Sequence, residues 1–156
     1  MAACSFGKGR CLYMRIQTRD FGGIEVAEED VVTFEGAIFG FEEYKKFVFL
    51  FQEDVSEHFV WLQSVEEPDL CFILVEPELV APGYRPGLPR DVQALLGPGE
   101  YMFWLIAVIR EEFQDSTVNL KSPIVINPAT RRAAQIILEE DYSLQHPLLA
   151  NKEGGC

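Results

Sequence analysis

The sequence predicts an all-β domain, either a small barrel-like fold or two packed antiparallel sheets, with one or two short helices. Three observations predict this class: short apolar segments recur along the chain, glycine and proline turns separate them, and helical periodicity is weak. The chain has 156 residues, of which 48% are hydrophobic and 12% aromatic. A chain of this length and composition buries a self-sufficient core, so we expect a single domain.

The predicted strands are rich in Val, Ile, Phe and Tyr, which suit a half-buried pleated surface. Several alternate apolar and polar residues, and glycines mark turns between them. Gly22 and Gly23 separate the first two strands, and Gly36 and Gly40 frame the loop after the third. We expect strands at residues 13–18, 24–26, 31–34, 46–51, 59–64, 70–75, 101–109, 120–126 and 134–138.

Helical signals are few. The best one covers residues 89–96, where Pro89 suits a first turn and Gly97 ends the helix. Residues 42–46 are predicted to form one helical turn. The proline-rich segment 77–89 is expected to be a long, stiff loop that either caps one end of the molecule or binds a partner. The apolar residues at helical spacing are Leu88, Val92, Leu95 and Leu96.

The charge balance is strongly acidic, with 13 Lys and Arg against 25 Asp and Glu and a net charge of −12. Basic residues form only isolated pairs, such as Lys45–Lys46 and Arg131–Arg132. Because phosphate backbones and anionic membranes require clustered basic side chains, we expect neither direct nucleic-acid binding nor membrane binding. An acidic surface favours a basic protein partner instead.

The longest apolar run, residues 101–109, is far shorter than the roughly 20 residues of a membrane-spanning helix. No apolar stretch typical of a secretory signal follows Lys8 and Arg10. The sequence therefore predicts a cytoplasmic protein. Cys71 lies in an apolar run and is expected to be a buried thiol. The other cysteines lie near the termini and are interpreted as exposed free thiols: Cys4, Cys11 and Cys156.

Motifs that carry chemistry are missing from the sequence. His58 and His146 lack the spacing of a metal site, and no glycine-rich phosphate loop or activated serine pattern occurs. Paired carboxylates are common, but they fall at strand ends, where such pairs are typical of solvated turns. We therefore expect no metal, no cofactor and no enzymatic activity. An acidic-dyad hydrolase stays open as an alternative if the fold brings two carboxylates into an apolar pocket.

Polar residues inside apolar segments have two interpretations. Gln63, Ser64, Asn119 and Asn127 lie at the ends of predicted strands or beside them. Their side chains either satisfy backbone groups at turns or form a polar ring at one end of the barrel that contacts a partner.

An ordered set of segments resembles the FliW family of flagellar assembly factors. The similarity begins with residues 14–50 and ends with the tail YSLQHPL at residues 142–148, and it covers about nine-tenths of the chain. Two features depart from the family pattern. Residues 1–13 precede the usual start, and the proline of the family's F-P-E-G-x-x-G-F pattern is missing after Phe34. The similar segments between the two ends are residues 59–64, 68–72, 116–120 and 123–128.

The resemblance implies a domain over residues 14–150, an N-terminal extension at 1–13 and a flexible tail at 151–156. It also implies a non-enzymatic, cytoplasmic barrel-like protein that binds flagellin near its C-terminal region. When released from flagellin, such a protein binds the carbon storage regulator CsrA and relieves repression of flagellin mRNA translation. The charge of −12 fits a basic RNA-binding partner.

Partner contacts are expected at aromatic or polar residues in loops and at strand ends. No heptad repeat indicates an oligomer, so we expect a monomer. The alternative function is a barrel that binds a small ligand, which requires an apolar cavity of about 300 Å³ or more; the large inward residues favour a filled core instead. The predicted partner-binding residues are Phe39, Phe41, Asp69, Tyr84, Asn119, Asn127 and His146.

Overall fold

The computed structural model describes residues 12–36, 38, 40–51 and 58–148. The helices are α1 (Pro77–Val80) and α2 (Arg90–Leu96), with short 3-10 turns η1 (Glu28–Asp30) and η2 (Phe113–Asp115). The strands are β1 (Tyr13–Gln17), β2 (Gly23–Ala27), β3 (Val32–Phe34), β4 (Lys46–Leu50), β5 (Phe59–Ser64), β6 (Cys71–Val75), β7 (Met102–Val108), β8 (Thr117–Val118), β9 (Ile124–Asn127), β10 (Arg132–Gln135) and β11 (His146–Pro147).

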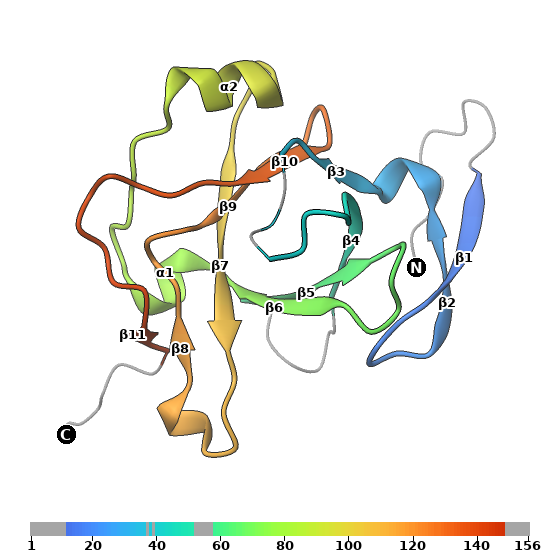
Figure 1. Cartoon of the computed structure of the whole chain (residues 1–156), viewed down its shortest axis with the longest axis horizontal. Coiled ribbons are helices and arrows are strands. Elements are labelled where there is room, and N and C mark those ends of the chain that lie inside the picture. The colour runs from blue at the N-terminus through green and yellow to red at the C-terminus, as the bar shows by residue number, and fades with distance from the viewer. Residues whose placement is uncertain (1–11, 37, 39, 52–57, 149–156) are drawn as a thin grey trace.

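Seven strands close a barrel in the order β7-β6-β5-β4-β3-β10-β9, and β9 pairs back onto β7 (Figure 1). All pairs are antiparallel except β3 and β10, which run parallel through Thr33 opposite Arg132. β8 and β11 extend the sheet from β7, while β1 and β2 form a separate two-stranded sheet. The all-β prediction is confirmed, and the barrel is the form that the chain adopts.

Large side chains fill the barrel. Phe34 and Phe47 are almost fully buried, and their rings meet edge to face with centroids 5.2 Å apart. Phe49 packs against Trp104 across the same core. Buried side chains from β3, β4, β5, β6, β7, β9 and β10 all join this cluster, as the large inward residues predict.

The outer faces of the barrel strands are apolar as well, and four elements cover them. Sheet β1–β2 packs over Val48 of β4, and α2 places Leu96 against Val125 of β9. α1 and the C-terminal segment cover β6 and β7. Strands buried on both faces read as continuous apolar runs rather than alternating ones, which explains the run CFILV of β6.

Two strand predictions are wrong in their boundaries. The predicted strand 120–126 begins only at Ile124, because the Asn119 side chain accepts hydrogen bonds from the backbone N–H groups of Lys121 and Ser122, both at 2.9 Å, and makes a turn. The predicted strand 134–138 is β10, which is shifted towards the N-terminus.

The helix predictions are partly right. α2 is present and stops at Gly97, whose φ of 89° suits glycine. Leu95 is 48% exposed, however, so it is not part of the buried helix face. The helical turn predicted for residues 42–46 is wrong: residues 42–43 form a turn in which Tyr44 N–H donates to the Phe41 carbonyl, and Lys46 already opens β4. The proline-rich loop opens with the short helix α1.

A candidate functional site beside the free edge of the barrel

The predicted partner-binding residues do not gather at one place. Phe39 lies outside the described residues. Phe41 is 38% exposed and packs edge to face on Phe72, near the start of β6. Asp69 is exposed in the turn just before β6, where its N–H donates to a Glu67 carboxylate oxygen at 3.2 Å.

Three other predicted residues lie around β8 and the segment that pairs with it. The Tyr84 hydroxyl donates to the Leu120 carbonyl at 2.6 Å, and its ring packs against Tyr142. Burial raises the pKa of this phenol well above its ordinary value. Asn119 forms the turn described above, and His146 is half-buried in β11 opposite Val118.

Asn127 is fully buried and serves the fold. Its amide nitrogen lies 2.9, 3.1 and 3.1 Å from the carbonyls of Leu96, Gly97 and Pro98, and its oxygen accepts from Ala129 N–H. The side chain therefore joins the end of α2 to the β9–β10 turn and offers no surface to a partner. Gln63 and Ser64 likewise satisfy backbone groups at the β5–β6 turn.

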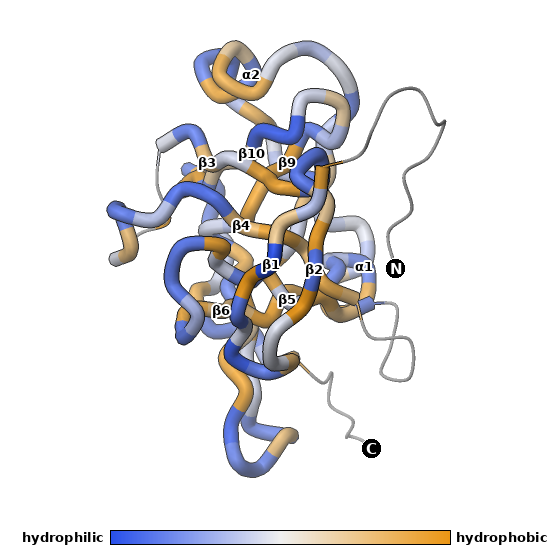
Figure 2. Tube along the Cα trace, turned by 90° about the vertical axis from the view of Figure 1, so that its right-hand side faces the viewer, coloured by the Kyte–Doolittle hydropathy of each residue, from blue (hydrophilic) through white to orange (hydrophobic). Residues whose placement is uncertain are grey.

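An open groove of about 690 Å³ lies between sheet β1–β2 and the barrel. Its floor is apolar, and its walls carry two carboxylates and one guanidinium. Figure 2 looks from this side of the molecule, with β1 and β2 in front of β4 and β5. The lining residues are Phe21, Ile24, Glu25, Val26, Asp30, Val32, Val48, Phe49, Leu50, Phe51, Ile126, Pro128 and Arg131.

The groove exists because β3 is short. β3 pairs with β4 only at Val32 opposite Phe47 and Thr33 opposite Lys46. Before Val32 the chain turns away through η1, so Val48–Phe51 have no neighbouring strand on that side within the described part of the chain. Core residues of the barrel, such as Phe49 and Ile126, thereby reach the groove.

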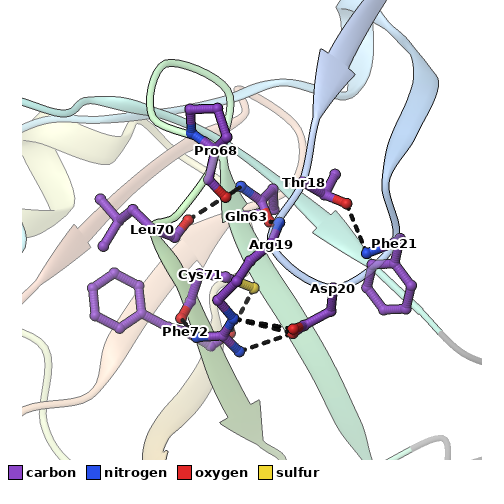
Figure 3. Close-up of polar contacts among 9 residues, drawn as sticks. All are labelled: Thr18, Arg19, Asp20, Phe21, Gln63, Pro68, Leu70, Cys71 and Phe72. Carbon is purple, nitrogen blue, oxygen red and sulfur yellow. Dashed lines mark hydrogen bonds and ion pairs between the residues drawn. The ribbon is translucent and has the colours of Figure 1, made fainter.

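Hydrogen bonds from Arg19 to Gln63 and Cys71, here called the polar latch, hold the β1–β2 hairpin that forms one wall of the groove (Figure 3). The Arg19 backbone N–H donates to Gln63 Oε1 at 3.0 Å, and Arg19 Nη1 donates to the Cys71 carbonyl at 2.9 Å. Arg19 also pairs with Asp20, and this hydrogen bond raises the guanidinium pKa. Next to the latch, Phe21 packs edge to face on Trp61, and so the latch sets the position of a lining residue.

Arg131 lies on the opposite wall in the β9–β10 turn. Its φ is +62°, and among the described residues it is the one non-glycine residue with a positive φ. That conformation is unfavourable for an arginine. Its guanidinium makes no hydrogen bond or ion pair with any residue that the structure describes. A strained, half-buried arginine beside a groove, with no side-chain partner among the described residues, is a feature typical of binding sites.

A model of the FliW protein family matches residues 15–148 of this sequence. The chain belongs to the FliW family. Two relatives, both named flagellar assembly factor FliW, come from Caldanaerobacter subterraneus subsp. tengcongensis and Geobacillus kaustophilus. The first is 37% identical over 87% of this chain and 93% of the relative. The second is 39% identical over 89% and 98%.

A crystal structure of the flagellar assembly factor FliW also matches, with a TM-score of 0.82 and 38% identity over 89% of this chain and 99% of that one. The agreement covers the fold as well as the sequence, so the closed barrel described above is that of a FliW protein. In this family member the missing proline has a local effect. Glu35 N–H donates to the Ala133 carbonyl at 2.8 Å, and a proline directly after Phe34 would remove that donor.

Sequence reasoning missed the groove of this FliW-family protein, although one signal was present. Val32–Phe34 is a very short strand preceded by the acidic run Glu28–Asp30, and a short strand leaves part of its neighbour unpaired. Within the described part of the chain, no group of three or more His, Cys, Asp or Glu residues is arranged to hold a metal ion. None of the helices described there is long and apolar enough to cross a membrane.

Proposed function

We propose that this protein is a non-enzymatic flagellar assembly factor that exchanges two partners in the cytoplasm. One partner is flagellin, bound through its C-terminal region. The other is the translational regulator CsrA, which the protein binds and antagonises when flagellin leaves it. Membership of the FliW family over residues 15–148 carries the proposal, because the relatives are named flagellar assembly factors.

The charge of the protein supports the second partner. A net charge of −12 accelerates encounter with a basic RNA-binding protein and repels the messenger itself. Screening shortens this attraction, since the Debye length falls from about 30 Å at 0.01 M salt to about 3 Å at 1 M. The complex with the regulator is therefore expected to weaken with salt more than the complex with flagellin.

The test is a titration of the full chain with purified flagellin and with purified CsrA, at low and high salt, followed by competition. We expect both to bind, flagellin to displace CsrA, and a reporter of flagellin mRNA translation to recover when free protein is added to CsrA. Failure of both proteins to bind at low salt would exclude this function.

A second candidate, binding of a small ligand, has one observation in its favour. The groove of about 690 Å³ exceeds the roughly 300 Å³ that a small-molecule site needs. The groove is open to solvent, however, and the barrel interior is filled by aromatic side chains. Native mass spectrometry of the protein isolated from its host would show a bound small molecule if this candidate is right.

A further inference from the structure

The backbone of β4 offers an unused strand edge to the groove. Backbone groups of successive residues in a strand point to opposite sides. The Lys45 carbonyl accepts from Phe34 N–H on β3, whereas the Lys46 carbonyl accepts from Val65 N–H on the β5 side. Odd-numbered residues of β4 therefore face β3. Because β3 begins at Val32, opposite Phe47, the N–H and C=O of Phe49 point to a side where no described residue forms a neighbouring strand.

This edge favours an extended occupant over a helical one. A helix laid in the groove would bury the Phe49 backbone groups without partners, because its own backbone groups are already bonded to one another. An extended segment would pair with them and place alternate side chains on the apolar floor. The cost of leaving buried backbone groups without hydrogen-bond partners therefore favours the extended segment.

The charges on the groove walls restrict the segment further. Arg131 presents a guanidinium with no partner among the described residues, which fits a carboxylate on the occupant. Glu25 and Asp30 line the hairpin side and fit a basic group. A segment that carries both signs matches this arrangement, whereas a uniformly basic surface such as that of the regulator would face Arg131.

We propose that an extended segment from the C-terminal region of flagellin adds to β4 as a further strand, with a carboxylate on Arg131. The inference rests on the proposed function and assigns flagellin, rather than the regulator, to the groove.

The experiment measures amide hydrogen exchange of the full chain by NMR, with and without a synthetic peptide of the flagellin C-terminal region. We expect the Phe49 amide to exchange at least about tenfold more slowly in the complex, because it gains a partner. Amides of β6, which already pair on both sides, serve as the internal reference.

Two matched pairs of variants accompany it. Phe51 follows β4, and its side chain is 62% exposed. Phe51→Pro removes the ring and the N–H, whereas Phe51→Ala removes only the ring, so we expect the proline variant to bind the peptide about tenfold more weakly than the alanine variant.

The second pair tests the charge of Arg131. Arg131→Gly suits the positive φ and keeps the fold, but we expect it to bind the peptide about tenfold more weakly than the wild type. Arg131→Lys restores the positive charge and should recover part of the lost affinity.

The outcomes separate this inference from the proposed function. The peptide could bind without slowing exchange of the Phe49 amide, and with the same affinity for Phe51→Pro and Arg131→Gly as for the wild type. In that case the groove assignment is wrong and the flagellin partnership stands. If CsrA protects Phe49 and the peptide does not, the assignment of partners is wrong. If neither flagellin nor its peptide binds the wild type, both proposals fail.

Discussion

Two buried amides, Gln63 and Asn127, use the same chemistry in two regions with different consequences. Each side chain is fully buried, and the two N–H groups of each amide are shared among three backbone carbonyls within 3.3 Å of the nitrogen. The bond made by the amide oxygen differs. The Asn127 oxygen accepts from Ala129 N–H in its own turn, whereas the Gln63 oxygen accepts from Arg19 N–H in the turn between β1 and β2. Among the described strands, β1 and β2 pair with each other and with no strand of the barrel.

The two amides are expected to affect stability in different ways, one globally and one locally. Asn127 binds α2 onto the barrel and belongs to the closed unit, so its loss is expected to weaken the whole fold. The Gln63–Arg19 bond connects the barrel to sheet β1–β2, so its loss is expected to release that sheet and the groove wall first. The variants below test this division, in order of expected effect.

The largest effect is expected for Asn127→Ala. The carbonyls at the end of α2 and the Ala129 N–H lose their bonds to a fully buried side chain, so the free energy of unfolding should fall by about 3 kcal/mol in urea titrations. Asn119→Ala is the matched control, since that amide accepts two N–H bonds in a half-buried turn and should cost about 1 kcal/mol. Equal losses would contradict a special role for Asn127.

The reaction rate of the Cys71 thiol tests how well this side chain is buried beside the polar latch. Burial raises the thiol pKa from 9.0 to about 11. At pH 8 the thiolate fraction should be roughly 100-fold below that of the unfolded chain, so reaction with DTNB should slow accordingly. The measurement uses a variant in which the other three cysteines are serine. Rapid labelling of the native protein would contradict the burial of this thiol.

The raised pKa of the Cys71 thiol also makes the stability of the protein depend on pH. The folded state keeps the thiol neutral up to pH about 11, whereas the unfolded chain ionises near 9.0. The contribution of this group is therefore complete below pH 9 and declines as the pH rises towards 11.

Glycines in the two regions give a third test. Gly97 and Gly22 both have positive φ, at 89° and 68°. A Cβ at Gly97 would lie 3.0 Å from Thr130 Cγ2, while a Cβ at Gly22 would meet nothing within 4 Å. We expect Gly97→Ala to cost about 2 kcal/mol and Gly22→Ala about 1 kcal/mol in the same urea assay. The reverse order would show that the hairpin turn is the tighter of the two.

The smallest global effect is expected for Arg19→Ala. Loss of the bond from this partly exposed side chain to the Cys71 carbonyl should lower the free energy of unfolding by only about 0.5 kcal/mol. Amide exchange in β1 and β2, and DTNB labelling of Cys71, should accelerate more than exchange in β5. Uniform acceleration across the protein would place the hairpin inside the closed unit.

Most strands could be predicted from the sequence, because local composition decides them. β5, β6 and β7 combine apolar runs with clear turn signals and were located within about two residues. The errors at residues 119–123 arose from a side-chain turn of Asn119 inside an apolar stretch. Such a turn competes with the strand locally, and its outcome depends on tertiary pairing.

The groove was not predicted, because it depends on where one strand stops relative to its neighbour. The short apolar run after Glu28–Asp30 signals an unpaired neighbour, but it does not show that Val32 opposite Phe47 is the outermost pair of β3 and β4. The prediction that amides satisfy backbone groups holds for Gln63, Asn119 and Asn127, since their strand-end positions are local. The roles of Phe41, Asp69, Tyr84 and His146 in partner binding stay predictions.

The parallel pairing of β3 with β10 decides when the barrel can close during synthesis. Thr33 pairs with Arg132, 99 residues further along the chain. At a synthesis rate of about 5–20 residues per second, the ribosome needs on the order of 5–20 s to supply this partner. Until then β3 presents an open edge to the crowded cell, and closure of the barrel must wait for the last quarter of the chain. The protein is therefore most exposed to misassembly while it is being made.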